Sequence, residues 1–284
     1  MKWSWKLGRF AGIDTYVHAS FLLLVAWSAW SAWSGAGSGL AVVLGVGFLL
    51  AVFASVLLHE LGHALMARRF GIRTRRIVLS PIGGVAQLEG MPAAPRQELA
   101  VALAGPAVNF ALAAGLWVLS PVFAGVPLLS SMVGGVMVAN LVLGTFNLLP
   151  AFPMDGGRAL RALLAERKGS TRATEIAARI GKGLALVMGL AGLWWGQYLL
   201  ALVAAFVWFA ADAELRHSRM NAYLDEVEVL GAQAQRRSWT DLFGGRSTAY
   251  EGRHPYRSSR SAWASTTRSP VPQPLLIVVR RFVR

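Results

Sequence analysis

The stretch SVLLHELGHALMARRF, residues 55–70, places two histidines and a glutamate at the end of a long apolar segment. From Thr15 to Leu58 the chain contains no Asp, Glu, Lys or Arg. Titratable groups at membrane depth are costly, and they are found there mainly where they serve a function. The stretch therefore predicts a membrane helix that carries a functional polar cluster at one end.

The composition extends this interpretation to the whole chain. Of its 284 residues, 55% are hydrophobic and 15% are charged, whereas a soluble domain carries about 25% charged residues. Residues 99–154 and 183–211 are also free of charged side chains. Apolar runs of more than about 18 residues are typical of transmembrane helices. The sequence therefore predicts an all-α polytopic membrane protein.

Six transmembrane spans are predicted, and they form one domain over residues 1–214. The spans cover roughly residues 17–34, 40–66, 98–120, 130–149, 181–195 and 197–213. Basic residues cluster in alternate loops and at both ends, while the intervening loops at 34–39, 120–131 and 196–197 carry no charge. By the positive-inside rule, both termini should be cytoplasmic.

The formal charge of +14 is best explained by the same distribution. Because the basic residues flank apolar runs, we expect anionic lipid headgroups as their partners and no nucleic acid. Residues 215–284 form a basic tail, with a short amphipathic helix over 216–237. From Ser238 onward, the tail is rich in Ser, Arg, Gly and Pro, and we expect it to be largely disordered. The N-terminus resembles a signal peptide but lacks a clear cleavage site, so we expect it to be retained.

The segment Ile72–Leu88, IRTRRIVLSPIGGVAQL, is too short to span and has no helical period. Its β-branched residues and the Gly83–Gly84 pair favour a short β-hairpin or a re-entrant loop. Such backbone is tolerated at membrane depth only where protein or water covers it. An ordinary cytoplasmic turn explains the segment equally well.

The motif HELGH, residues 59–63, matches the H-E-x-x-H pattern of zinc hydrolases. Residues four apart share a helix face, so His59 and His63 can direct two imidazole nitrogens at one ion. Glu60 lies about 100° round the helix and could reach a water molecule without binding the ion. The alternative is that these groups only extend towards the membrane interface beside Arg68 and Arg69.

A hydrolytic zinc site needs a third protein ligand. The chain has no cysteine, and the remaining histidines lie at the start of the first span or in the tail. Asp155, in NLLPAFPMDGGRAL, is the better candidate, because the predicted topology places it at the same depth as His59 and His63. Its alternative role is to cap a helix that begins near Gly156.

With these two motifs, the chain resembles the site-2 protease family of intramembrane zinc metalloproteases. The resemblance rests on HELGH and NLLPAFPMDGGRAL, with support from GIDTYVHASFLLL, SPIGGVAQLEG and AGPAVNFALA. It implies that one Zn²⁺ is held by His59, His63 and Asp155, with Glu60 as general base. It also implies that the hairpin region around Gly83, Gly84 and Val85 binds an extended substrate.

The resemblance also implies a setting for the reaction. The expected substrate is a single-span membrane protein cleaved in or near its membrane segment, and the expected location is a bacterial inner membrane. Regulatory cystathionine-β-synthase-type domains and PDZ domains, which some family members carry, are not expected here.

Two asparagines in the fourth span could assist such a reaction. Asn147 and Asn140 are seven residues apart and so share one helix face. Asn147 could stabilise an oxyanion or hold substrate backbone. For Asn140, and for Asn109 in the third span, an interhelical hydrogen bond is at least as good an explanation.

Another function class remains open, that of a membrane metal-ion transporter or a zinc sensor without proteolysis. A transporter should carry ligands along a path through several spans. The predicted ligands instead lie at one depth, which favours the protease.

Overall fold

The computed structural model describes residues 3–81, 83–90, 92 and 94–243. The chain divides into two compact units, and the first ends at Ala232. The second unit contributes only residues 233–243, the end of the last helix, to the described structure. Most of the predicted disordered tail, residues 244–284, lies outside the described residues.

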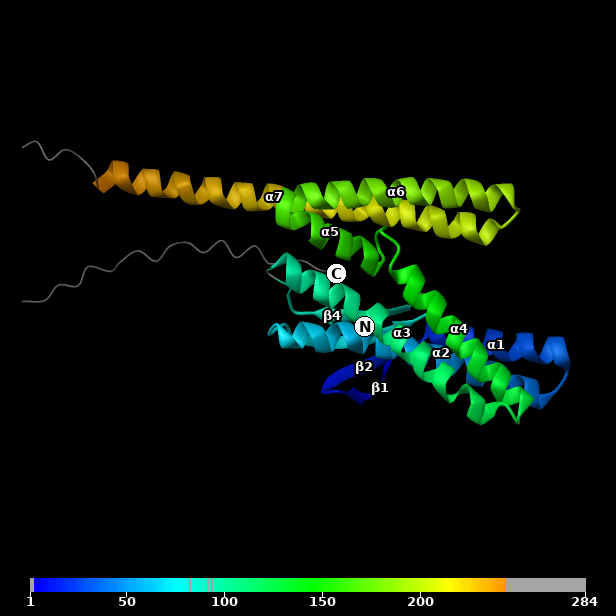
Figure 1. The fold of residues 1–284 in the computed structure, drawn as a ribbon. Helices are drawn as coiled ribbons and strands as arrows, with labels where there is room; N and C mark the ends of the chain where they lie inside the picture. The colour runs from blue at the N-terminus through cyan, green and yellow to red at the C-terminus, as the bar shows by residue number, and fades with distance from the viewer. Residues whose placement is uncertain (1–2, 82, 91, 93, 244–284) are drawn as a thin grey trace, which may run out of the picture. The chain divides into compact units, whose positions relative to one another are not determined.

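Helices make up most of the described chain (Figure 1). They are α1 (Ser20–Ala36), α2 (Gly39–Arg69), α3 (Pro95–Leu119), the 3-10 helix η1 (Ser120–Phe123), α4 (Pro127–Asn147), α5 (Asp155–Lys168), α6 (Ser170–Trp194) and α7 (Tyr198–Phe243). The strands are β1 (Ser4–Phe10), β2 (Ile13–His18), β3 (Thr74–Ser80) and β4 (Gly83–Leu88).

Five of these helices are long and apolar enough to cross a membrane, counted over the described residues. They are α2, α3 with η1, α4, α6 and the part of α7 up to Gly231. Each of the six predicted spans coincides with a helix, which confirms the polytopic α-helical fold. The first span corresponds to α1, whose 17 residues lie at the lower end of the range needed to cross about 30 Å of hydrocarbon.

The last two spans belong to longer helices than predicted. Helix α6 begins at Ser170, before the predicted edge at 181, and α7 is continuous over 46 residues. The amphipathic helix predicted at 216–237 is therefore a continuation of α7, and helix also extends past Ser238. The apolar residues of a sequence mark only the part of a helix that lies in lipid. They therefore do not predict the polar turns by which α6 and α7 continue beyond the bilayer.

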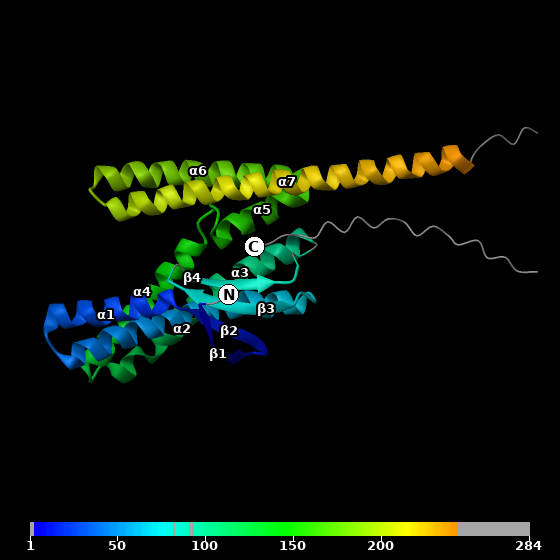
Figure 2. The ribbon, with the colours of Figure 1, turned by 180° about the vertical axis from the view of Figure 1, so that it is seen from behind.

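The predicted hairpin at 72–88 is confirmed by strands β3 and β4, which pair antiparallel. They belong to a four-stranded sheet of order β1-β2-β3-β4, in which β2 runs parallel to β3 (Figure 2). The hairpin of β1 and β2 was not predicted. Its turn has positive φ at Ala11 (50°) and Gly12 (86°), as in the tight turns that connect hairpin strands.

Three apolar clusters hold the elements that carry the site. In the first, Leu57, Leu61 and Ala64 of α2 pack against the sheet through Ile13, Ile77 and Leu79. In the other two clusters, Ala151, Phe152 and Met154, which precede α5, pack against residues of α6 and α7. Helices α6 and α7 lie side by side in both views (Figures 1 and 2). Helix α2 and the start of α5 are thus each fixed by apolar packing.

Candidate metal centre

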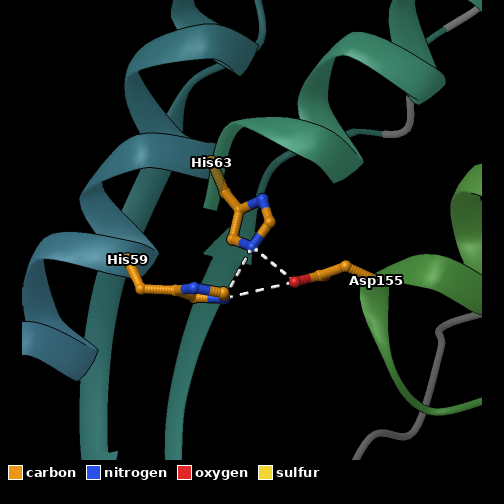
Figure 3. A group of neighbouring side chains, drawn as sticks. All are labelled: His59, His63 and Asp155. Atoms are coloured by element: carbon orange, nitrogen blue, oxygen red, sulfur yellow. Dashed lines mark hydrogen bonds and ion pairs between the residues drawn. The ribbon is translucent and has the colours of Figure 1, made fainter. Parts of the chain in front are cut away.

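Helix α2 places His59 and His63 one turn apart on a buried face (Figure 3). The two imidazoles are 7% and 8% exposed. Helix α3 passes very close to them, and a Cβ atom at Gly105 would lie 2.2 Å from Nε2 of His63 and 2.7 Å from Nε2 of His59. Gly105 therefore allows the backbone of α3 to approach the two rings closely.

Asp155 is the first residue of α5 and points at the two histidines (Figure 3). The glycines that follow it allow a tight turn, because a Cβ atom at Gly156 would lie 2.3 Å from the carbonyl oxygen of Leu148. At Gly157 a Cβ atom would lie 2.6 Å from the carbonyl carbon of Ala151. The DGG sequence therefore combines a ligand with the two small residues that bring it into place. The N-cap position belongs to Met154, not to Asp155.

The three side chains present a nearly equilateral triangle of donor atoms. Nε2 of His59 lies 3.1 Å from Nε2 of His63, and Oδ2 of Asp155 lies 3.2 Å and 3.1 Å from these two nitrogens. In a tetrahedral zinc site with bonds of about 2.0–2.1 Å, neighbouring donors are about 3.3 Å apart. The spacing therefore fits a zinc ion bound at one face of the triangle, with a fourth position left open.

The protonation of the imidazoles supports the same conclusion. Nδ1 of His63 lies 2.7 Å from the carbonyl oxygen of Val101, which can only accept, so this nitrogen carries the hydrogen. Nδ1 of His59 lies 2.5 Å from Oδ1 of Asn109, which also accepts. Both Nε2 atoms are then left with lone pairs that face the carboxylate oxygen. Three converging lone pairs repel one another unless a cation lies between them, so the residues present fit a metal ion.

Glu60, the candidate general base, contacts strand β4. Its Oε2 accepts a hydrogen bond from the amide of Ala86 on β4 over 3.2 Å. Glu60 directly follows His59 in helix α2, yet it is not part of the three-ligand group. Its carboxylate is therefore held against strand β4 beside the candidate metal centre.

The substrate-binding candidates lie in two different places. Gly84 lies against Glu60, so that an added Cβ atom would meet its Cγ at 2.5 Å, while Gly83 has open space and Val85 is exposed. Asn147 is partly buried and donates to the carbonyl of Leu143, one turn back in α4. Among the described residues, Gly84 is therefore the substrate-binding candidate that lies against Glu60, whereas the hydrogen bond of Asn147 stays within its own helix.

Asn140 is fully buried and acts between helices, as in the alternative that its position suggested. It accepts a hydrogen bond from Asn109 of α3 and donates to Ser55 of α2 and to Val136 of its own helix. Both Nδ2 hydrogens are thereby used, which leaves no donor for a substrate. Sequence reasoning missed the contact between Asn109 and His59, because the two residues are 50 positions apart.

A mainly helical fold with membrane-length apolar helices, a small sheet and a buried His-His-Asp group defines a membrane-embedded protein with a hydrolytic type of metal centre. The model of peptidase family M50 matches residues 47–140 and 129–188. The solved structure of the site-2 protease from Methanocaldococcus jannaschii is 40% identical and matches with a TM-score of 0.55, over 75% of this chain and 95% of that one. The chain belongs to peptidase family M50, the family of the site-2 proteases.

Curated relatives agree with this assignment. A zinc metalloprotease of Methanocaldococcus jannaschii is 42% identical over 220 residues, which are 76% of this chain and 62% of the relative. Rip3 of Mycobacterium tuberculosis is 39% identical over 215 residues, or 72% of this chain and 54% of Rip3. The chain thus spans between about half and two thirds of the length of these relatives. Zinc is the metal that the relatives' names and the donor geometry both support.

Proposed function

We propose that this protein is an intramembrane zinc metalloprotease that hydrolyses a peptide bond in or near the transmembrane segment of another membrane protein. The observation that carries the proposal is the convergence of His59 and His63, from the apolar helix α2, with Asp155 at the start of α5, all within 3.2 Å of one another. Family membership supports the same reaction class.

The chain's own residues have distinct roles in this reaction. His59, His63 and Asp155 hold the zinc ion, which, when bound, polarises the scissile carbonyl and makes water more acidic. Glu60 takes a proton from the attacking water and delivers it to the leaving amine nitrogen. The hydrogen bond from the amide of Ala86 to Oε2 restricts the orientation of the Glu60 carboxylate.

The substrate is proposed to be a single-span membrane protein that unwinds locally at the cleavage site. A helix shields its peptide groups with internal hydrogen bonds, and an unwound segment in a membrane needs new partners for them. Strand β4 is the last strand of the sheet, so its outer edge at Gly83 and Gly84 could pair with such a segment. Asn147 is the candidate for a contact with the oxyanion or the substrate backbone.

We further propose an orientation with both termini in the cytoplasm of a bacterial cell and with the spans in its inner membrane. Support comes from the basic residues that flank alternate spans, since anionic lipid and the positive-inside rule favour them at the cytoplasmic face. Residues 1–214 form the protease domain in this proposal, and the basic segment that follows contacts the cytoplasmic side.

A transporter or a metal sensor has less support. Among the described residues, His59, His63 and Asp155 form the one group of three side chains that could bind a metal ion together. A transport path would need further ligands at other depths. The single site beside a carboxylate base favours hydrolysis.

The test is to reconstitute the wild type and Glu60→Gln with a labelled single-span substrate, and to measure cleavage and bound zinc together. Glu60→Gln should bind zinc as the wild type does and lose cleavage by roughly 100-fold or more, because it removes the base. Glu89→Gln, which neutralises an exposed glutamate paired with Arg75, serves as the matched control and should cleave normally. Cleavage retained by Glu60→Gln would refute the assigned mechanism.

A further inference from the structure

Three helices meet in a buried polar network behind His59, on the side away from the metal centre. Nδ1 of His59 and Oδ1 of Asn109 are 2.5 Å apart, and Asn109 is completely buried. Nδ2 of Asn109 donates to Oδ1 of Asn140, which is also completely buried, over 3.0 Å. These contacts run from the metal-facing helix α2 through α3 to α4.

The far end of the network fixes the direction of every hydrogen bond in it. Nδ2 of Asn140 donates to the carbonyl oxygen of Val136 over 2.9 Å and to Oγ of Ser55 over 3.0 Å. Ser55 in turn donates to the carbonyl oxygen of Ala51 over 3.1 Å. Main-chain carbonyls only accept, so the orientation of the Asn140 amide is set. The orientation of Asn109 follows, and its oxygen must face His59.

We propose that Asn109 and Asn140 are positioning residues that hold His59 in its Nδ1–H tautomer and aim its Nε2 lone pair at the metal. The inference rests on the proposed ligation of zinc by His59. It assigns to this pair a role in metal affinity rather than in contact with the substrate. Partners of this kind typically change metal affinity or activity by 10- to 100-fold when they are removed.

The two histidines are supported in different ways, and this difference makes the proposal testable. His63 is held by the main-chain carbonyl of Val101, which no side-chain substitution removes. His59 is held by a side chain alone. A substitution at Asn109 should therefore loosen one ligand and leave the other in place.

A purely structural role for Asn109 would give a different result. Asn109→Leu leaves Oδ1 of Asn140 without its partner, which destabilises the fold whatever the role of Asn109. Asn140→Leu breaks the same pair at a similar cost, so a purely structural role predicts the same behaviour in both variants. If Asn109 positions His59, only Asn109→Leu should weaken zinc binding by the full 10- to 100-fold.

The experiment uses the full chain in detergent, with zinc affinity measured by competition with a chelator. Asn109→Leu should show the full loss, and Asn140→Leu a smaller one, because it leaves the Asn109 oxygen present but free to turn away. Asn109→Asp retains an acceptor for Nδ1 of His59 and should recover roughly tenfold of the lost affinity. Thr174→Val is the matched control, since Thr174 is equally buried but bonds only to Ser170 in its own helix.

A spectroscopic measurement separates positioning from general damage. In zinc-loaded, ¹⁵N-histidine-labelled protein, the Nδ1–H groups of His59 and His63 should both be protected from exchange with water. Asn109→Leu should abolish protection at His59 and retain it at His63. If both signals and the zinc affinity are unchanged in Asn109→Leu, the inference is wrong while zinc ligation stands. If the wild type binds no zinc, the proposed function itself fails.

Discussion

The amide of Ala86 on strand β4 donates a hydrogen bond to Oε2 of Glu60 on helix α2, over 3.2 Å. This contact links the strand with the free edge to the carboxylate proposed as general base. The neighbouring Gly84 lies flat against the same side chain. The position of β4 therefore sets both where an extended segment could pair and how the base is oriented.

Gly84→Ala should consequently impair catalysis without removing the metal. Its Cβ atom would lie 2.5 Å from Cγ of Glu60, so either the carboxylate or the strand must shift. Because a displacement of about 1 Å can cost about 100-fold in rate, we expect cleavage to fall by roughly 10- to 100-fold. Zinc content should equal that of the wild type. Gly90→Ala, where an added Cβ meets nothing within 4 Å, is the control, and equal activity of the two variants would contradict the prediction.

Gly105→Ala should instead destroy the metal centre. The added methyl group would overlap Nε2 of His63 and crowd Nε2 of His59, the two atoms proposed to bind zinc. We expect zinc binding and cleavage to be lost together, as measured by metal analysis of the purified protein and by proteolysis. Gly115→Ala provides a control in the same helix with open space around the new methyl. It should be neutral or stabilise the helix by up to about 1 kcal/mol.

Asp155→Asn tests the third ligand separately from the histidines. The amide keeps the size of the side chain but removes the negative charge that completes the donor set. Zinc affinity should fall by on the order of 100-fold, with cleavage lost at limiting zinc. The control is Asp212→Asn, which removes a carboxylate that contacts Lys182 and Arg216 away from the metal centre. Unchanged zinc affinity in Asp155→Asn would remove this residue from the ligand set.

The ligand group could be predicted from the sequence for two reasons. His59 and His63 are four residues apart in a predicted helix and therefore share a face. The predicted topology places Asp155 at the same depth in the membrane as these histidines. The contact of His59 with Asn109 could not be predicted in this way, because it depends on where α2 and α3 cross. The N-terminal hairpin was missed for a different reason: its strands are six and seven residues long, and they precede an apolar run that dominates any hydropathy pattern.

The helix that carries Asp155 is also held by charge, which gives a prediction about stability. Arg161 of α5 bonds to Glu98 of α3 and to Glu214 of α7, and the side chains of Arg161 and Glu98 are only 13% and 14% exposed. Removing one partner of a buried ion pair leaves the other charge without compensation, at a cost of about 3 kcal/mol. Arg161→Leu should therefore lower the free energy of unfolding by about this amount, and the melting temperature in detergent with it.

A second ion pair between the same two helices supplies the control for this measurement. Arg96 of α3 bonds to Glu166 of α5 with side chains 87% and 43% exposed, and exposed pairs contribute about 0–1 kcal/mol. Glu166→Gln should thus change the unfolding free energy by less than about 1 kcal/mol. The double variant Glu98→Met/Arg161→Met removes both charges of the buried pair and should be more stable than Arg161→Leu. If Arg161→Leu and Glu166→Gln prove equally mild, the buried pair does not anchor α5, and apolar packing of residues 151–154 alone holds Asp155 in place.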